Sequence, residues 1–546
     1  MIGVAANAAN LETIEEFFEL FKTPWEPAVP SREYQVVLDA GGRTDNLQAE
    51  LVLVYGSGEE AIDRLAGVPV ERVSGAVDLA WGETTLPIYG GVALLQRTPG
   101  MLVSGQKTAD YSHRSGQRLV RRFGYDLCGE VRHLLAGHQS AARAAIPTLE
   151  LHIDLLRRVL LESGVGFVEV LPRPERHDFI CCLTHDVDFY GIRRHGFDRT
   201  LAGFVARASV GTLMDLSRQR RTLSEALRNW TALASLPFVH LGIAPDFWRP
   251  FEDYAGVESP RHSTFFLVPT KGQPGVAPGG GVETARAVPY EVSEIRTPAT
   301  HAVARGSELA VHGIDAWRDA DAGRRELQEI TSVTTRPTAG VRMHWLYFDA
   351  GSPRMLEAAG FDYDSTYGFN DAVGYRAGTG QVFRLPGTER LLELPLSIMD
   401  SALFSGGRMA LAADQARALT RQILANARQF GGTVVINWHG RSLAPERLWD
   451  TFYQTLLNEL RKGGRVWFAT ATEAVDWFKW RRGIRFTRAA DGDTTAIEVS
   501  APGPHDHPGV IRLHTPGRTG ARAKDFAFGG NTPLTIQTPQ LQRTHG

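Results

Sequence analysis

The chain has 546 residues and a formal net charge of -2, with 43% hydrophobic and 22% charged residues. This length predicts two or three domains, each able to bury its own core. The small net charge gives no global field to attract nucleic acid or an anionic membrane, and no nucleic-acid partner is expected. Of the three cysteines, Cys181 and Cys182 are adjacent in an apolar run, which is typical of buried strand residues in a reducing compartment.

Two features of the sequence bear on location. Residues 1–10 have no basic flank and no long apolar stretch, so no signal peptide is predicted. No run of about 18 apolar residues without a charge occurs, so no membrane span is predicted. The expected location is therefore cytoplasmic.

Residues 1–172 are predicted to form an α/β domain of unknown role. An amphipathic helix at 11–21 precedes short strand-like runs, and helices are predicted at 117–135 and 148–163. Strands followed by helices are typical of an α/β or α+β domain. The two prolines in 171–174 indicate a domain boundary.

Residues 173–483 show short apolar runs that alternate with helical patterns. Continuous apolar strands separated by helices predict a parallel sheet that is buried on both faces. Six or seven such units favour an open or irregular barrel, with a mostly helical insertion at about 193–253. The predicted strands are 179–183, 264–268, 308–311, 340–343, 391–396, 434–437 and 465–469.

The last segment, 484–546, loses the helical periodicity. Short alternating runs predict a small β-rich appendage that ends in a frayed tail. The predicted fold class is therefore α/β, an irregular barrel with an α/β domain before it and a β-rich appendage after it.

Polar side chains follow four of the predicted barrel strands. In parallel α/β barrels, the side chains at the carboxyl ends of the strands face the active site. If these strand ends share one rim, their side chains converge, which is stronger evidence than any single motif. The four groups are His185-Asp186-Val187-Asp188, His312-Gly313-Ile314-Asp315, Arg342-Met343-His344 and Trp438-His439-Gly440.

Asp186 and Asp188 are two residues apart, so both side chains point the same way along an extended strand. Two such close carboxylates repel unless a cation or a proton separates them. One can bind a metal while the other acts as a base. The alternatives are turn aspartates that cap the next helix, or the paired acids of a metal-dependent glycosyltransferase.

The other strand-end residues each allow two interpretations. His312 is either a zinc-type ligand or a core histidine, and Asp315 is either a further ligand or a helix N-cap. Arg342 needs an anionic partner, which is either an active-site aspartate or a structural acid. His439 is either a general acid or a neutral histidine packed on tryptophan. Among the aromatic residues near the rim, Trp345, Tyr347 and Trp438 either stack on sugar faces or pack in the core.

These strings resemble the motifs of the polysaccharide deacetylases, which are carbohydrate esterase family 4 with its NodB-type homology domain. The resemblance covers roughly 175–480, with the motifs in the family's order. Leu183–Asp188 resembles the first motif, Gly340–His344 the third, Phe361–Thr366 the fourth and Val435–His439 the fifth.

The resemblance implies an irregular (β/α)7 barrel and a role for each matched residue. Asp186 would be the base that activates water, Arg342 would orient it, and His439 would protonate the departing amine. Asp188 and His312 would bind a divalent metal, with zinc as the expected ion. Substrate contacts are expected from Trp345, Asp364 and Trp438.

One position departs from the family pattern. The second motif normally has another histidine four residues after the first, and Ala316 stands there. Asp315 or His344 would then supply the third ligand that a catalytic zinc needs, unless that ligand is missing.

The resulting hypothesis is a metal-dependent hydrolase that removes an N-acetyl group from an amino sugar in a polysaccharide or oligosaccharide. One alternative is a non-catalytic barrel that binds a glycan or a partner protein. Another is an amidase that acts on a small cytoplasmic metabolite.

Overall fold

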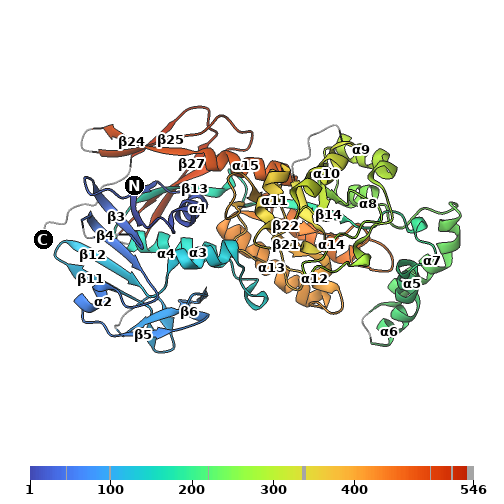
Figure 1. The fold of residues 1–546 in the computed structure, drawn as a ribbon, viewed down its shortest axis with the longest axis horizontal. Coiled ribbons are helices and arrows are strands. Elements are labelled where there is room, and N and C mark those ends of the chain that lie inside the picture. Colours follow the sequence, from blue (N-terminus) through green and yellow to red (C-terminus); the bar gives the residue numbers. More distant parts are fainter. Residues whose placement is uncertain are drawn as a thin grey trace.

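The computed structural model describes all residues except 43, 45, 97–99, 219–220, 335–339, 492–493, 518–519 and 538–546. The molecule is elongated (Figure 1). The N-terminal residues and the C-terminal strands form one end, the barrel follows, and helices α5–α7 form the other end. The predicted frayed tail lies largely outside the described residues.

The central element is a ten-stranded sheet in the order β19-β20-β18-β17-β16-β15-β14-β22-β21, with β23 paired to β14. Its pairings are parallel except for β19 with β20. All seven predicted barrel strands coincide with strands of this sheet, because buried parallel strands need continuous apolar runs. The strands are β14 (Phe179–Val187), β15 (Thr264–Leu267), β16 (Glu308–Gly313), β17 (Gly340–Met343), β18 (Tyr363–Asp364), β19 (Phe383–Arg384), β20 (Leu392–Glu393), β21 (Leu396–Met399), β22 (Thr433–Asn437) and β23 (Val466–Phe468).

The sheet curls into a barrel, and one stretch of chain joins its two sides. β20 pairs with β18, whereas β21, which is separated from β20 by only two residues, pairs with β22. The strand predicted at 391–396 is therefore divided between two neighbours. Pro395 lies at the division, where its missing N–H removes a ladder hydrogen bond. The prediction of an irregular α/β barrel is confirmed.

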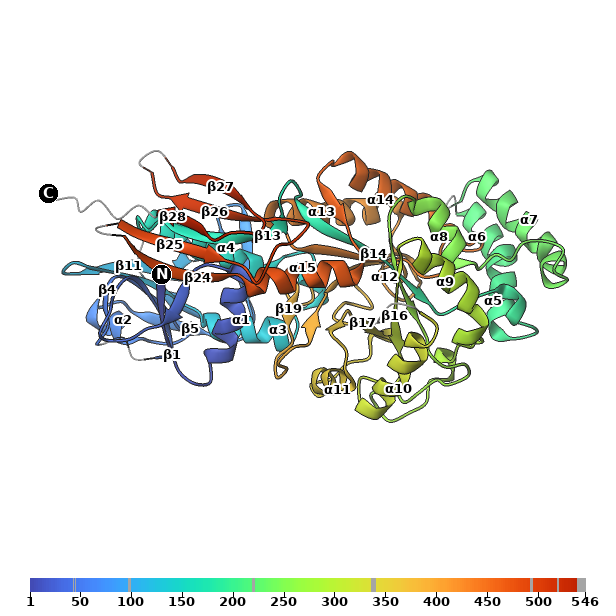
Figure 2. The ribbon, with the colours of Figure 1, turned by 90° about the horizontal axis from the view of Figure 1, so that it is seen from above.

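Amphipathic helices cover the outside of the barrel (Figure 2). In α13 (Ala413–Phe430) the buried residues are Ala416, Thr420, Ile423, Leu424 and Ala427, which form one stripe at helical spacing. The other covering helices are α9 (Arg296–Ala304), α10 (Ala320–Thr331), α11 (Ser352–Ala359), α12 (Asp400–Phe404), α14 (Asp450–Lys462) and α15 (Ala471–Gly483).

The helical insertion predicted at about 193–253 lies between β14 and β15. It has its own small core around Phe204 and Trp248. Both ribbon views place its first helices at the end of the molecule farthest from the N-terminal sheet. Its helices are α5 (Arg199–Ala206), a π-helical turn at Arg207–Gly211, α6 (Thr212–Ser217), α7 (Leu223–His240) and α8 (Pro250–Glu258).

The N-terminal part contains two six-stranded sheets. One has the order β11-β12-β4-β3-β1-β2 and the other β5-β8-β10-β9-β6-β7. The first is mostly parallel and the second antiparallel. Its strands are β1 (Ile2–Ala6), β2 (Trp25–Pro27), β3 (Glu33–Ala40), β4 (Gln48–Tyr55), β5 (Val70–Val73), β6 (Val77–Trp81), β7 (Thr84–Ile88), β8 (Val92–Leu95), β9 (Val103–Ser104), β10 (Lys107–Thr108), β11 (Asp110–Ser115) and β12 (Arg118–Phe123), and its helices are α1 (Leu11–Phe21), α2 (Ala61–Leu65), α3 (Leu127–Ala136) and α4 (Thr148–Glu162).

The prediction of a helix at 117–135 is wrong over its first half. Residues 118–123 form β12, and the helix begins only at Leu127. β12 pairs with β11 in a hairpin and with β4 in parallel. These pairings between strands outweigh the local helical preference.

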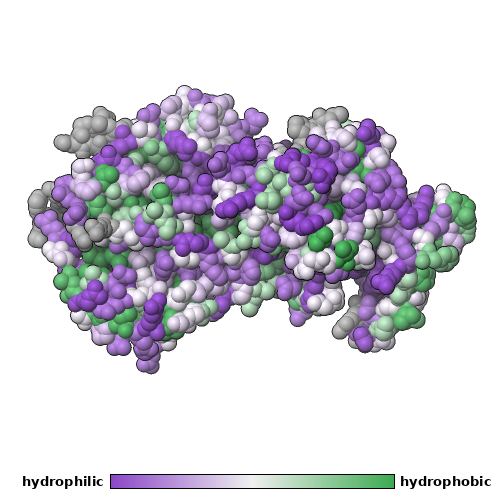
Figure 3. Space-filling view, in the orientation of Figure 1, coloured by the Kyte–Doolittle hydropathy of each residue, from purple (hydrophilic) through white to green (hydrophobic). Residues whose placement is uncertain are grey.

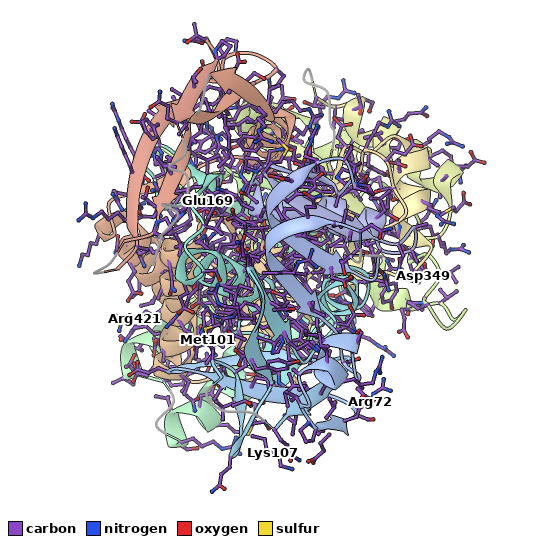
Figure 4. The ribbon with its side chains drawn as sticks, turned by 90° about the vertical axis from the view of Figure 1, so that its left-hand side faces the viewer. Arg72, Met101, Lys107, Glu169, Asp349 and Arg421 are labelled. Carbon is purple, nitrogen blue, oxygen red and sulfur yellow. The ribbon has the colours of Figure 1, made fainter. Side chains whose placement is uncertain are left out.

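The C-terminal strands pack onto the N-terminal part. β13 (Phe167–Pro174) runs across the predicted boundary at 172 and pairs with β26 (Gly509–Thr515), which pairs with β27 (Arg522–Phe528). A further sheet joins β24 (Arg485–Asp491), β25 (Thr494–Ser500) and β28 (Leu534–Gln537). Glu169 on β13 lies at this junction (Figure 4), where it bonds Arg157 Nη2 at 2.9 Å and His514 Nε2 at 2.7 Å.

A buried arginine ties the barrel to the N-terminal part. Arg481 of α15 donates to the carbonyl oxygens of Glu19, Leu20 and Val170 at 3.0, 3.0 and 2.7 Å. We expect Arg481→Met to lower the free energy of unfolding by about 3 kcal/mol, because buried carbonyls lose charged donors. Chemical denaturation measures this loss. A loss no larger than that of Lys479→Met, on the same helix, would contradict the assigned role.

Among the described residues, no helix has the length and apolar character needed to cross a membrane.

Candidate functional site

The predicted strand ends meet at one rim of the barrel. β14 lies between β15 and β22, and β16 lies between β15 and β17. In the register, His312 is opposite Arg342, and Thr184 is opposite Asn437. Side chains alternate along a strand, so His185 points away from Asp186 and bonds the Trp438 carbonyl oxygen instead.

Three of these residues bring ligand atoms together. Asp188 Oδ1 lies 3.3 Å from His312 Nε2 and 3.4 Å from His344 Nε2. One atom from each residue lies within 4.8 Å of the other two, which makes this group a candidate metal site. Two imidazoles and one carboxylate are a common ligand set for a catalytic divalent metal with an open position.

The surroundings of the group suit a metal. His312 Nδ1 lies 2.9 Å from the Arg342 carbonyl oxygen, so Nδ1 carries the proton and Nε2 keeps its lone pair. Burial lowers the pKa of His344 to about 3, which keeps this imidazole in the neutral, ligating form. Asp188 Oδ1 is buried and has no hydrogen-bond partner in the described part of the chain. An added cation would satisfy this oxygen.

Asp315, one of the predicted ligands, does not join the group, and this prediction is corrected. Its Oδ1 accepts from Val276 N at 3.0 Å and from Arg318 Nε at 3.0 Å. The position where the family has a histidine is Ala316, which is fully buried. His344 is the third member of the candidate group. It comes from a turn in which Trp345 has φ 64, an uncommon conformation for a non-glycine residue.

Asp186 lies beside the metal group and is held by two donors. Arg342 Nη1 donates to Asp186 Oδ1 at 2.9 Å, and Asn437 Nδ2 donates to Oδ2 at 2.6 Å. Arg342 is itself fully buried and donates to Ser365 Oγ at 3.0 Å and to Thr184 Oγ1 at 2.9 Å. The carboxylate therefore has a fixed orientation.

The charge state of Asp186 follows from its neighbours. Burial opposes ionisation, but the charges of His312, Arg342 and His439 outweigh it and hold the pKa of Asp186 below its ordinary value. Its Oδ2 lies 3.7 Å from His312 Nε2. An ionised carboxylate at this distance from the ligand group can accept a proton from a water molecule held there.

His439 faces the same cleft and is paired with Asp400, a residue that the sequence reasoning missed. His439 Nδ1 lies 2.6 Å from Asp400 Oδ1, and its backbone N–H donates to Oδ2 at 2.7 Å. Burial alone would lower the pKa of His439, but Asp400, helped by Asp188 and Asp186, raises it to about 9. The imidazole is therefore protonated at neutral pH, with Nε2 as its second donor.

The predicted substrate contacts have three different outcomes. Trp345 is 38% exposed and lines the cleft. Asp364 is fully buried and bonds Thr366, and burial raises its pKa to about 7. Trp438 is fully buried and stacks on Tyr453, with ring centroids 4.9 Å apart. Neither Asp364 nor Trp438 can touch a substrate in this structure, so both predictions are corrected.

A large cleft opens above the site. Its volume is about 890 Å³, and its wall includes Asp186, Asp188, His312, His344 and His439. The helical insertion and the loop around 284–289 form other parts of this wall. The fold and the site together define a curled parallel α/β barrel with a candidate Asp-His-His metal group at its rim.

Neither a protein-family model nor a curated protein sequence matches the chain. Among solved structures, it is similar to a protein from Mycobacterium smegmatis described as a polysaccharide deacetylase, with 20% identity and a TM-score of 0.35, over 57% of this chain and 95% of that one. It is also similar to Puue allantoinase, with 15% identity and a TM-score of 0.33, over 56% and 92%. A third similar structure is a carbohydrate esterase family 4 pseudoenzyme from Bacillus anthracis, with 11% identity and a TM-score of 0.24, over 54% and 65%. Each match leaves a large part of this chain outside the similar region.

Proposed function

We propose that the protein is a metal-dependent hydrolase that cleaves a C–N amide bond, with the N-acetyl group of an amino sugar as its substrate. The observation that carries this proposal is the placement of an ionised Asp186 and a protonated His439 around one Asp-His-His group. An acid and a base held in opposite protonation states at one cleft are what amide hydrolysis needs. The similar solved structures are too distant to indicate the reaction. The proposal therefore depends on the geometry of the site itself.

The metal group would be Asp188, His312 and His344. A divalent cation there, with zinc as our expectation, would polarise the acyl carbonyl and make a bound water more acidic. Asp186 then takes the proton of the attacking water, and Arg342 and Asn437 keep its carboxylate turned toward the ligand group. His439 gives its proton to the departing nitrogen, because an amide nitrogen leaves poorly without one.

The geometry weighs against a barrel that only binds. The missing histidine at Ala316 would suggest a disabled site, but His344 restores a group of three ligands. Binding alone would not require a buried proton acceptor and a protonated donor on either side of that group.

A substrate panel tests the proposal. The zinc-loaded full chain is incubated with an N-acetylated chitooligosaccharide, a small acyl amide and a cyclic ureide, and acetate and free amine are measured. Turnover of the oligosaccharide supports the proposal, and turnover of only the small amide or the ureide favours the small-metabolite amidase. Stoichiometric metal with no turnover of any substrate would favour the binding protein.

A pH profile tests the role of His439. Asp400→Asn removes the largest of the charges that raise the pKa of His439, while burial, Asp188 and Asp186 remain, so this pKa should fall from about 9 to a lower value. Because the folded pKa is raised, the His439–Asp400 pair stabilises the wild type fully below about pH 6.5 and ceases to do so as the pH rises through about 9. As the pH rises, the variant should therefore lose the activity that needs protonated His439 at a lower pH than the wild type does.

The measurement is kcat/KM against pH for both proteins. A bound cation shifts the alkaline limb of the pH profile toward lower pH in the wild type and in the variant alike. The limb of the variant therefore still lies at lower pH than the limb of the wild type. Coincident alkaline limbs would exclude His439 as the proton donor.

A further inference from the structure

Six arginines line the cleft above the metal group, and they greatly outnumber its carboxylates outside the catalytic group. The arginines are Arg199, Arg207, Arg286, Arg408, Arg441 and Arg447. Apart from Asp186 and Asp188, Asp198 is the one carboxylate that the described residues contribute to the cleft wall. Asp198 is already occupied, because it bonds His195 Nδ1 at 2.7 Å and caps α5.

Arg207, Arg441 and Arg447 form one cluster within this set. Besides burial, the charge of Arg207 lowers the pKa of Arg441, and the charges of Arg441 and Arg207 lower the pKa of Arg447. Within the described residues, none of the three has a carboxylate at ion-pair distance. The carboxyl group that acts on the charge of all three is Glu446, which is buried, and burial raises its pKa. Even when ionised, this single carboxyl group offsets only one of the three positive charges.

Aromatic rings lie against the faces of two of these guanidinium groups. Arg441 lies over the Phe189 ring at 3.9 Å, and Arg447 lies over the Trp449 ring at 4.9 Å. Stacking holds a guanidinium in place through its face and leaves the N–H groups in its plane available. The Nε atoms of Arg207 and Arg447 are buried and have no partner in the described part of the chain.

These arginines lie close to the proposed reaction centre. Arg441 is two residues after His439, and Phe189, on which it stacks, directly follows Asp188. Like charges cluster in a partly desolvated wall only at a cost, unless an anion offsets it. A fork of fixed, unpaired guanidinium N–H groups fits the oxygens of a carboxylate or a phosphate.

From this geometry we propose that Arg207, Arg441 and Arg447 bind an oxyanion on the substrate, so that the natural substrate is an acidic amino sugar. This extends the proposed function, because it names the charge of the substrate that the same cleft accepts. The oxyanion is either a carboxylate on a neighbouring uronic acid or a phosphate on the sugar itself.

Direct binding tests the proposal without relying on turnover. The full chain is titrated with a hyaluronan tetrasaccharide, chitotetraose and N-acetylglucosamine 1-phosphate, and the heat of binding is measured. The first two ligands have the same length and both carry N-acetyl groups, but only the first has carboxylates. We expect at least one acidic ligand to bind roughly tenfold or more tightly than chitotetraose, and the tighter of the two identifies the oxyanion.

Two variants and one control make the test specific. Arg447→Gln, alone and with Arg441→Gln, should weaken the acidic ligand by roughly tenfold or more per arginine and leave chitotetraose unchanged. Arg305→Gln removes the same charge from an exposed position outside the cleft and should change nothing. Metal content is measured in every variant.

The outcomes separate this proposal from the proposed function. If the protein binds the acidic ligand through the arginines and yet hydrolyses no amide, that result would support the oxyanion site and contradict the proposed hydrolase function. Equal affinity for acidic and neutral ligands, arginine variants that bind like the wild type, or no binding of any ligand would each overturn the oxyanion site.

A second, independent feature is an apolar surface on the helical insertion. Ten of the fifteen large hydrophobic residues that the structure exposes lie within 197–243. Figure 3 shows green atoms gathered at this end of the molecule, over α7. The exposed members of α7 follow helical spacing on one side, while its other side packs into the core of the insertion. The exposed set is Phe197, Val205, Val210, Leu213, Met214, Leu223, Leu227, Phe238, Leu241 and Ile243.

The charge of this segment indicates what covers it. Residues 193–243 contain eight arginines and three acids, a net charge of +5, whereas the whole chain has -2. Three of these arginines, Arg193, Arg194 and Arg228, pair with Asp246, Glu294 and Asp450 outside the range, which leaves a net charge of +2. Exposed apolar side chains among arginines are typical of helices that lie in the interface of an anionic membrane.

We propose that the apolar surface of 197–243 docks on an anionic lipid surface. The full chain is sedimented with phosphatidylcholine vesicles that do or do not contain phosphatidylglycerol. Binding should need phosphatidylglycerol, weaken with added salt, and be lost in Leu227→Ser/Phe238→Ser/Leu241→Ser. Leu65→Ser, which changes a 70% exposed residue in the N-terminal part, serves as the control.

No vesicle binding, or equal binding by wild type and triple variant, would overturn the docking proposal. Self-association in the absence of vesicles that the triple variant abolishes would overturn it as well, by assigning the surface to a contact between copies.

Discussion

Asp186→Asn is expected to lower kcat/KM for the amide substrate by about 1,000-fold, within the range of general acid–base catalysis. Asparagine keeps the size of the side chain, but its single carbonyl oxygen can accept from only one of Arg342 and Asn437, and it cannot accept a proton from water. The pKa of Asp186 lies below its ordinary value, so the wild type carries the ionised base at neutral pH. Steady-state kinetics and metal analysis measure the two effects separately, and the metal content should stay near the wild-type level.

A matched control uses the neighbouring strand-end carboxylate. Asp315→Asn changes an acid that bonds Val276 and Arg318 outside the ligand group, so activity should stay close to the wild type. If Asp315→Asn caused the larger loss, the assignment of the base would be wrong.

His344→Ala is expected to weaken metal binding by at least about 100-fold, because even residues behind the ligands contribute 10 to 100-fold to metal affinity. His344 Nε2 lies 3.4 Å from Asp188 Oδ1 and completes a group that otherwise has only Asp188 and His312. Metal content after dialysis against buffered zinc measures the loss, and activity should fall with it.

The control for this variant is another imidazole of the same cleft. His195→Ala changes a residue that bonds Asp198 and lies outside the ligand group, so the metal should be retained. Full metal content in His344→Ala, together with metal loss in Asp315→Ala, would restore Asp315 as the third ligand.

The barrel could be predicted from the sequence because its signal is local. Each buried parallel strand is an apolar run, and the polar residue that ends the run marks the rim. This reasoning brought Asp186, Asp188, His312, Arg342 and His439 to one site, where the structure also places them.

Two residues of the site were missed for reasons that differ. Asp400 directly follows β21, so the strand-end rule would have found it, but the predicted strand ended at 396 rather than at Met399. Asn437 lies within a strand, and only its pairing opposite Thr184 brings its amide to Asp186.

The predicted substrate contacts of Trp438 and Asp364 are wrong because their side chains point away from the cleft. Trp438 is next to Asn437, and adjacent strand residues point to opposite sides, so Trp438 packs against Tyr453 of α14. Asp364 lies within the fourth motif but bonds Thr366 inside the fold. Proximity in sequence to a motif did not indicate which way these side chains face.

The sequence by itself determined the class of the barrel, the order of its strands along the chain and most of the polar residues at its rim. Local patterns of apolar and polar residues are sufficient to indicate burial and strand period. Only the tertiary structure decided which residue joins Asp188 and His312 in the candidate metal group, which acid pairs with His439, and which arginines lie together in the cleft. These depend on contacts between segments far apart in the chain, and on the turn at Trp345 that carries His344 to Asp188. No local pattern contains that information, since such contacts exist only after the strands have paired.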